Sequence, residues 1–247
     1  QNIIQLTKQF TQKLSELSAP KEIRIGTTSA TAIRMLDDIL PKYRALHPEE
    51  AVSILDCSNI DTAIYSLENG KMDLVFVTAH TDKLYHGPFH VLAKEELFLA
   101  APSSHPACTR YGEIAFPKLT APKILQLFPA CPFILPYQGS SIRYLVDNFF
   151  QNYLYDHHRI HNAADISTIL DMVANGLGLG FIPLTRLTAN SNIKYFALSP
   201  KMIRLHAVLI KSDAKLEDYR ELIGLAARYY KKHISSLSLP KKDAEES

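Results

Sequence analysis

The sequence of 247 residues has little net charge, no long apolar run and few cysteines. Its 27 Lys and Arg residues nearly balance 25 Asp and Glu residues, and no run of more than two Lys or Arg residues occurs, so it lacks the charge pattern that binds phosphate backbones. No apolar run approaches the roughly 18 residues of a transmembrane helix, and the N-terminus shows no signal-peptide pattern. We therefore expect a soluble chain that itself contacts neither DNA nor a membrane.

Cysteine occurs only as Cys57, Cys108 and Cys131. The number is odd, the spacing is wide and no C-x-x-C pair occurs, which excludes a disulfide framework and favours reduced, structural thiols. A composition of 47% hydrophobic and 21% charged residues also excludes a disordered chain. We expect a globular protein of the cytoplasm, whose length suits either one large domain or two lobes.

Catalytic and cofactor motifs are also missing. The sequence has no G-x-S-x-G, H-E-x-x-H or G-x-x-x-x-G-K-[ST] motif. The Gly-Leu-Gly-Leu-Gly segment at 176–180 follows a predicted helix and precedes a predicted strand, the reverse of a dinucleotide-binding fingerprint, so it indicates a tight turn. His157, His158 and His161 have no further ligand at a metal-site spacing. We predict no catalytic residue, no metal and no cofactor.

Strand and helix patterns alternate after Pro20. A first series has predicted strands at 22–26, 51–57 and 73–77 and helices at 30–46 and 60–68. Two strands at 89–93 and 96–101 follow, and a second series then has strands at 133–135, 159–163, 178–182 and 194–198 and helices at 140–153 and 167–174. A strand at 203–210 and a helix at 216–232 end the pattern. This alternation predicts an α/β fold with parallel sheet.

Four prolines between residues 102 and 122 separate the two series and predict a crossing between two lobes. We expect lobe I at 21–98 and 206–232, and lobe II at 99–205. Residues 233–247, which end in a polar and charged run, are expected to form a flexible tail.

The first 18 residues are predicted to form a separate helix. Its apolar residues Ile3, Phe10 and Leu17 are spaced seven apart, which is typical of a seam that pairs with another helix. The pattern therefore favours a dimerising helix, although a surface helix packed on its own domain has the same pattern.

Two loops occupy equivalent places in the two series, between a strand and the start of a helix. They are Gly-Thr-Thr-Ser at 26–29 and Pro-Tyr-Gln-Gly-Ser-Ser at 136–141. In open α/β sheets, ligands bind beyond the carboxyl ends of the strands, where helix starts offer free N–H groups. Hydroxyl and N–H donors at such a place suit a carboxylate or another oxyanion. The same residues could instead serve only as N-caps.

Several segments, in order along the chain, resemble the effector-binding domain of LysR-type transcriptional regulators. They are IRIGTTS at 23–29, the segment 39–44 with Pro48, LENGKMDLV at 67–75, FILP at 133–136 with GSS at 139–141, and VANGLGLGFIP at 173–183. The resemblance covers about residues 1 to 232. It implies a periplasmic-binding-protein-like fold (type 2) of two Rossmann-like lobes, with a small effector in the cleft between them. It also implies that residues 1–18 are the end of a linker helix that pairs two subunits.

The resemblance assigns the effector contacts by position. These residues are Thr28, Ser29, Thr31, Thr78, Gln138, Gly139, Ser140, Ser141, Ile166 and Ser167. Cys57-Ser58-Asn59 stands where the family commonly has a glycine, which puts contacts from that loop in doubt.

The resemblance implies the sensor domain of a homodimeric or homotetrameric transcription regulator. Such a protein reaches DNA through a winged helix-turn-helix that this sequence does not contain, and a chain that opens on Gln1 rather than Met fits a fragment or a processed product. The alternative is a solute-binding protein of a transport system, which has the same fold. An enzyme on this fold is a third possibility, but the sequence shows no acid–base pair for it.

Overall fold

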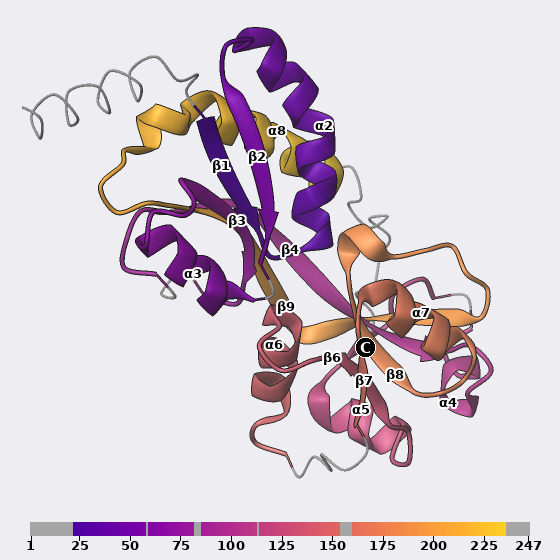
Figure 1. Ribbon diagram of the computed structural model, residues 1–247. Helices are drawn as coiled ribbons and strands as arrows, with labels where there is room; N and C mark the ends of the chain where they lie inside the picture. Colours follow the sequence, from indigo (N-terminus) through magenta and orange to yellow (C-terminus); the bar gives the residue numbers. More distant parts are fainter. Residues whose placement is uncertain (1–21, 58, 82–84, 113, 154–159, 236–247) are drawn as a thin grey trace, which may run out of the picture.

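The computed structural model describes residues 22–57, 59–81, 85–112, 114–153 and 160–235. Within these ranges nine strands form one sheet in the order β2-β1-β3-β9-β4-β8-β6-β7, with β5 paired to β9. Figure 1 shows the sheet running through two halves, each with helices on its faces. The predicted α/β class is confirmed. The predicted helix at 1–18 lies outside the described residues.

The first half contains the first strand–helix series. Its elements are β1 (Glu22–Thr27), α2 (Ala30–Leu46), β2 (Ala51–Asp56), α3 (Ile60–Glu68) and β3 (Leu74–Ala79). Strand β1 pairs in parallel with both β2 and β3, as the alternation of strands and helices predicts. The helix boundaries of α2 and α3 match the sequence prediction at both ends.

Alternation along β3 decides which helices cover each face of the first half. Leu74 and Phe76 point into a core with α2 and with α8 (Arg220–Ser235). Val75 and Val77 point the other way, into a core with α3. Successive side chains of a strand face opposite sides, so a strand buried on both faces reads as a continuous apolar run, as β3 does from Leu74 to Val77.

Two long strands join the halves. The strands β4 (Phe89–Pro102) and β9 (Ile193–Ile210) pair antiparallel along most of their length, with register shifts at Val91/Ala93 and Leu97/Phe98. The sequence predicted two short strands in place of each, because polar residues interrupt the apolar pattern near the middle of both. Figure 1 shows β4 and β9 passing from one half to the other.

The proline-rich stretch is not the crossing that the sequence suggested. It forms α4 (Pro106–Thr109), β5 (Lys118–Leu119) and α5 (Ala121–Leu127), which the sequence did not predict. Their apolar side chains, including Cys108 and Ile124, belong to the core of the second half. The prolines therefore shape a connection within that half, while hydrogen-bonded strands make the crossing.

The second half holds the second strand–helix series. Its elements are β6 (Phe133–Pro136), α6 (Ser141–Phe150), β7 (Ile160–Ala163), α7 (Ile166–Ala174), β8 (Leu179–Pro183) and the short 3₁₀ helix η2 (Leu184–Arg186). The rings of Phe133, Phe150 and Phe181 meet in its core, with centroids 5.3 to 6.1 Å apart. Full burial of such a side chain stabilises a fold by about 1.5–3 kcal/mol.

The chain returns to the first half at its end. After the 3₁₀ helix η3 (Leu216–Tyr219), helix α8 packs beside α2, where Leu222, Ala226 and Tyr230 are buried. Helix α8 extends to Ser235, so residues 233–235 are helical rather than part of the predicted flexible tail. No helix in the described ranges is both long and apolar enough to cross a membrane.

The glycines at 176–180 form the predicted helix-to-strand turn. Asn175 caps the end of α7, Gly176 adopts φ of +79°, and β8 begins at Leu179. A Cβ atom on Gly178 would lie 2.4 Å from the Pro132 carbonyl oxygen, so only glycine fits there. The turn is structural, as the order of helix and strand indicated.

Candidate functional site

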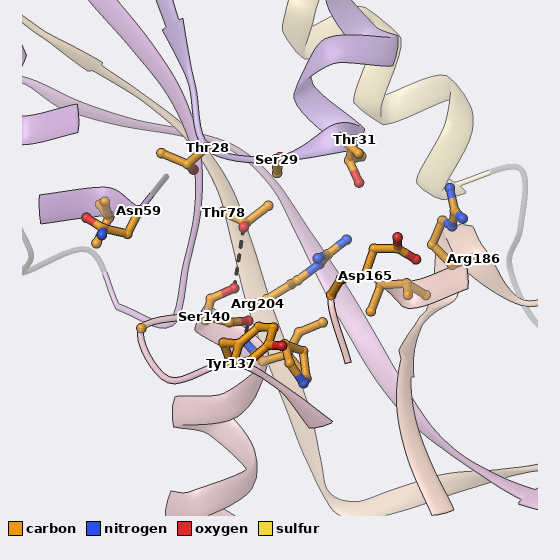
Figure 2. A pocket seen from close by; sticks show the side chains of 18 of the residues that line it. Thr28, Ser29, Thr31, Asn59, Thr78, Tyr137, Ser140, Asp165, Arg186 and Arg204 are labelled. Carbon is orange, nitrogen blue, oxygen red and sulfur yellow. Dashed lines mark hydrogen bonds between the residues drawn. The ribbon is translucent and has the colours of Figure 1, made fainter. Parts of the chain in front are cut away.

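A cavity of about 520 Å³ lies between the two halves, at the carboxyl ends of β1, β3 and β6. Its walls come from the starts of α2, α3, α6 and α7 and from the ends of these strands (Figure 2). All ten residues assigned by position line this one cavity: Thr28, Ser29, Thr31, Thr78, Gln138, Gly139, Ser140, Ser141, Ile166 and Ser167. Its volume is in the range of small-molecule sites.

The starts of α2 and α6 face the cavity with their N-caps in place. Ser29 Oγ accepts a hydrogen bond from Ala32 N at 3.2 Å, and Ser140 Oγ accepts one from Ile142 N at 3.2 Å. These serines therefore cap their helices and also line the cavity, so the geometry is compatible both with a capping role and with contact to a ligand. Neither helix has an acidic residue in its first turn, so the positive end of each dipole is uncompensated toward the cavity.

Two side-chain contacts bridge the halves. The Ser141 hydroxyl donates to Thr78 Oγ1 over 3.4 Å, which is drawn in Figure 2. The ring of His80, after β3, stacks on Tyr144 of α6 with centroids 3.6 Å apart. Burial in this stack lowers the pKa of His80, so the ring is neutral at neutral pH.

Charged residues of the cavity were not among those predicted from the sequence. Arg34 of α2, Arg186 of η2 and Arg204 of β9 all line it. The signal for Arg204 was misleading, because the apolar Ile203 and Leu205 flank it and indicate an outward side chain, whereas in the structure it is buried on the same face as His206. Arg34 and Arg186 had none, since both are ordinary residues of polar segments.

Arg204 is held from behind by the buried carboxylate of Glu95. Its Nε donates to Glu95 Oε2 at 2.7 Å, and Nη2 lies 2.7 Å from the same oxygen. The same carboxylate accepts from His206 Nε2 at 2.6 Å and from the backbone N and hydroxyl of Thr185 at 2.8 and 2.5 Å. These contacts tie the two crossing strands to η2 directly beside the cavity.

The protonation states of this cluster follow from its contacts. Burial raises the pKa of Glu95, but the Arg204 charge and the bonds from His206 and Thr185 outweigh it and hold the pKa far below its usual range. Burial lowers the pKa of His206, and its bond to Glu95 does not overcome this effect. At neutral pH the cluster is an ionised Glu95–Arg204 pair with a neutral histidine that donates from Nε2.

Among the described residues that line the cavity, Asp165 is the acidic one. Its carboxylate caps α7 by accepting from Thr168 N at 2.8 Å, and this bond lowers its pKa. Arg186 donates to Ser167 Oγ at 2.8 Å. Burial and the nearby charges of Arg34 and Arg204 lower the pKa of Arg186, which remains cationic at neutral pH. The cavity is therefore electropositive.

A different group of side chains has atoms close enough to share a metal ion. His47, Glu49 and Glu50, after the end of α2, have ligand atoms within 4.8 Å of one another. These atoms already have protein partners, since His47 pairs with Glu221 and Glu50 accepts from the Tyr43 hydroxyl at 2.6 Å. The three cysteines are free, and burial raises the pKa of Cys108 to about 11, which suits a structural thiol.

The fold and cavity together define a two-lobed ligand-binding domain of the periplasmic-binding-protein-like kind. The chain matches the family model described as the LysR substrate binding domain over residues 18–229, and it belongs to that family. No curated protein sequence matches the chain.

Solved structures with this fold include two known regulators. The reduced form of OxyR aligns with a TM-score of 0.67 and 17% identity, over 87% of this chain and 98% of that one. The BenM effector-binding domain with its effector benzoate aligns with a TM-score of 0.66 and 19% identity, over 93% and 100%. A full-length BenM mutant aligns with a TM-score of 0.69 and 20% identity, over 97% and 78%.

Proposed function

We propose that this LysR substrate-binding domain senses a small anionic metabolite, such as a carboxylate, in the cavity between its halves. The observation that carries the proposal is that ten residues from separate segments, all assigned from the family resemblance, line a single cavity. Uncompensated helix starts and arginines give that cavity a positive character. Effector binding there would change how the halves, and the subunits attached to them, are placed.

The family match favours a regulator over a solute-binding protein of a transport system. We propose that the chain acts in the cytoplasm without catalysing a reaction, as part of a homodimer or homotetramer. We place the linker helix at 1–18, lobe I at 21–98 and 206–232, and lobe II at 99–205. DNA would be contacted only by a domain beyond this sequence.

A thermal-shift screen of metabolites tests the proposed site. A ligand at one hundred times its Kd adds about 2.7 kcal/mol to the free energy of unfolding, which gives a clear shift. Ser29→Asp and Ser141→Asp should abolish the shift caused by an anionic hit, because each places a negative charge at the cavity wall. Both should fold normally, since aspartate suits an N-cap and the first turn of a helix.

Thr120→Asp is the matched control. Thr120 is the exposed N-cap of α5 and lies outside the cavity, so the same change adds the same charge elsewhere. It should leave the ligand-induced shift intact. Equal shifts in the wild type and in both serine variants would refute this placement of the site.

A further inference from the structure

Arg204 presents an unsatisfied donor beside the cavity. The side chain is 5% exposed, and its Nη2 lies 2.7 Å from Glu95 Oε2 as an ion pair but makes no well-directed hydrogen bond with any residue that the structure describes. The reason lies in Glu95, whose Oε2 already accepts from Arg204 Nε and His206 Nε2 and whose Oε1 accepts twice from Thr185. A buried guanidinium nitrogen whose N–H donors remain unused is unfavourable, so this group is suited to a further acceptor that the ligand supplies.

Arg204 is one of three arginines that reach the cavity from different elements. Arg34 is on α2 in the first half, Arg186 is on η2 in the second, and Arg204 is on the crossing strand β9. Their mutual repulsion contributes to the lowered pKa of Arg186. Asp165 offsets only one of these charges within the lining, and Glu95 offsets another from behind. The arginine group is therefore left with net positive charge.

One side of the cavity carries uncharged polar side chains, and the other side carries charged ones. Figure 2 shows Thr28 and Asn59 on one side, Asp165 and Arg186 on the other, and Arg204 between them. The apolar side chains that line the cavity, from Ile60, Ile142 and Ile166, suit a short carbon chain. A single carboxylate bound at the starts of α2 and α6 would leave the net positive charge of the arginine group without a partner in the ligand.

We propose that the effector is a dianion with two separated acidic groups. One group binds the N–H and hydroxyl donors at the starts of α2 and α6, and the second binds Arg204, Arg186 and Arg34. This inference rests on the proposed function and specifies the class of ligand. Arginine is suited to the second group because its planar fork binds a carboxylate or phosphate through two donors.

Calorimetric titration with matched acids tests the proposal. The probes are succinate, glutarate and adipate, compared with butyrate, pentanoate and hexanoate at the same ionic strength. At least one dicarboxylate should bind, and at least tenfold more tightly than the monocarboxylate of equal length, because a charge-assisted hydrogen bond contributes about this factor.

Substitutions of the arginines test whether they bind the second acidic group of the ligand. Arg186→Met and Arg34→Met should each weaken dicarboxylate binding about tenfold while leaving monocarboxylate binding nearly unchanged. Arg204→Lys keeps the charge beside Glu95 and should also weaken dicarboxylate binding, with circular dichroism as the check on folding. Arg44→Met, at an exposed site in the last turn of α2 outside the cavity, should match the wild type.

The dianion proposal would be overturned if dicarboxylates and monocarboxylates bound with equal affinity. It would also be overturned if the Arg186 and Arg34 variants bound dicarboxylates as tightly as the wild type. Failure of every dicarboxylate to bind at millimolar concentration would overturn it too. In either case a metabolite whose binding is lost in Ser141→Asp would still support the proposed function. The two proposals therefore fail through different results.

Discussion

Glu95, beside the cavity, is fully enclosed by its partners. It is 0% exposed, and both carboxylate oxygens accept hydrogen bonds from β9 or η2. A buried ion pair adds little net stability compared with an apolar pair, but removing one partner leaves the other charge buried and alone. The contribution of Glu95 is therefore to orient Arg204 toward the cavity.

Glu95→Gln should lower the free energy of unfolding by about 3–5 kcal/mol, because it leaves the Arg204 charge without its counter-ion. Urea unfolding measures this loss. Glu96→Gln is the control, since Glu96 pairs with the exposed Lys201 at 2.8 Å and such pairs contribute at most about 1 kcal/mol. Equal losses in the two variants would show that the buried cluster has no special role.

His206 gives the fold a pH dependence with a definite sign. Its pKa is lowered in the folded state, mainly by burial, so below about pH 6.5 the unfolded state binds a proton that the folded state does not. The neutral ring therefore contributes stability above that pH, and this stability is lost as the pH falls below it. The slope is at most about 1.4 kcal/mol per pH unit.

His206→Gln keeps a donor for Glu95 but cannot titrate. The free energy of unfolding of this variant should fall less between pH 7 and pH 5 than that of the wild type, whatever its absolute stability. Urea titrations at several pH values measure the difference. Parallel curves for the two proteins would show that His206 is not the group that titrates.

At the scale of the elements, Asp165 at the start of helix α7 has both a structural and an electrostatic role. Asp165 caps this helix through Thr168 N and also places a negative charge at the cavity wall. The starts of α2 and α6 carry serine caps instead, which satisfy the backbone without charge. The choice of cap at each helix thus sets the electrostatic character of the cavity.

Asp165→Asn separates the two roles of Asp165, because asparagine caps a helix as well as aspartate does. Stability should change by less than about 0.5 kcal/mol, while affinity for an anionic ligand should rise about threefold or more as the repulsion is removed. Calorimetry measures the affinity. Asp171→Asn, at an exposed site on the same helix outside the lining, is the control and should leave affinity unchanged.

At the scale of the whole molecule, β4 and β9 are the elements shared by both halves. Each half has its own apolar core, and these strands contribute to the cores on both sides of the crossing. The Ser141–Thr78 bond and the His80–Tyr144 stack are two contacts that bridge the halves. A ligand held by both halves would add to these contacts and so change the balance between arrangements of the halves.

The parts of this architecture that depend on local pattern were predictable from the sequence. The loops at 26–29 and 136–141 and the turn at Gly176 follow from strand and helix signals close in the chain. The crossing was not predictable in this way, because the continuity of β4 and β9 depends on pairing between residues 91 to 120 positions apart. The same pairing sets Arg204 opposite Glu95, which no local pattern could have shown.

A crystal structure of the chain, grown with an anion that stabilises it in the thermal-shift screen, tests the central claim most directly. We predict that the anion lies in the cavity between the halves, with one acidic group at the starts of α2 and α6 and another at Arg204. An anion bound elsewhere, such as in the hollow between β4 and α8 near Lys94 and Arg228, with the central cavity unoccupied, would contradict the account.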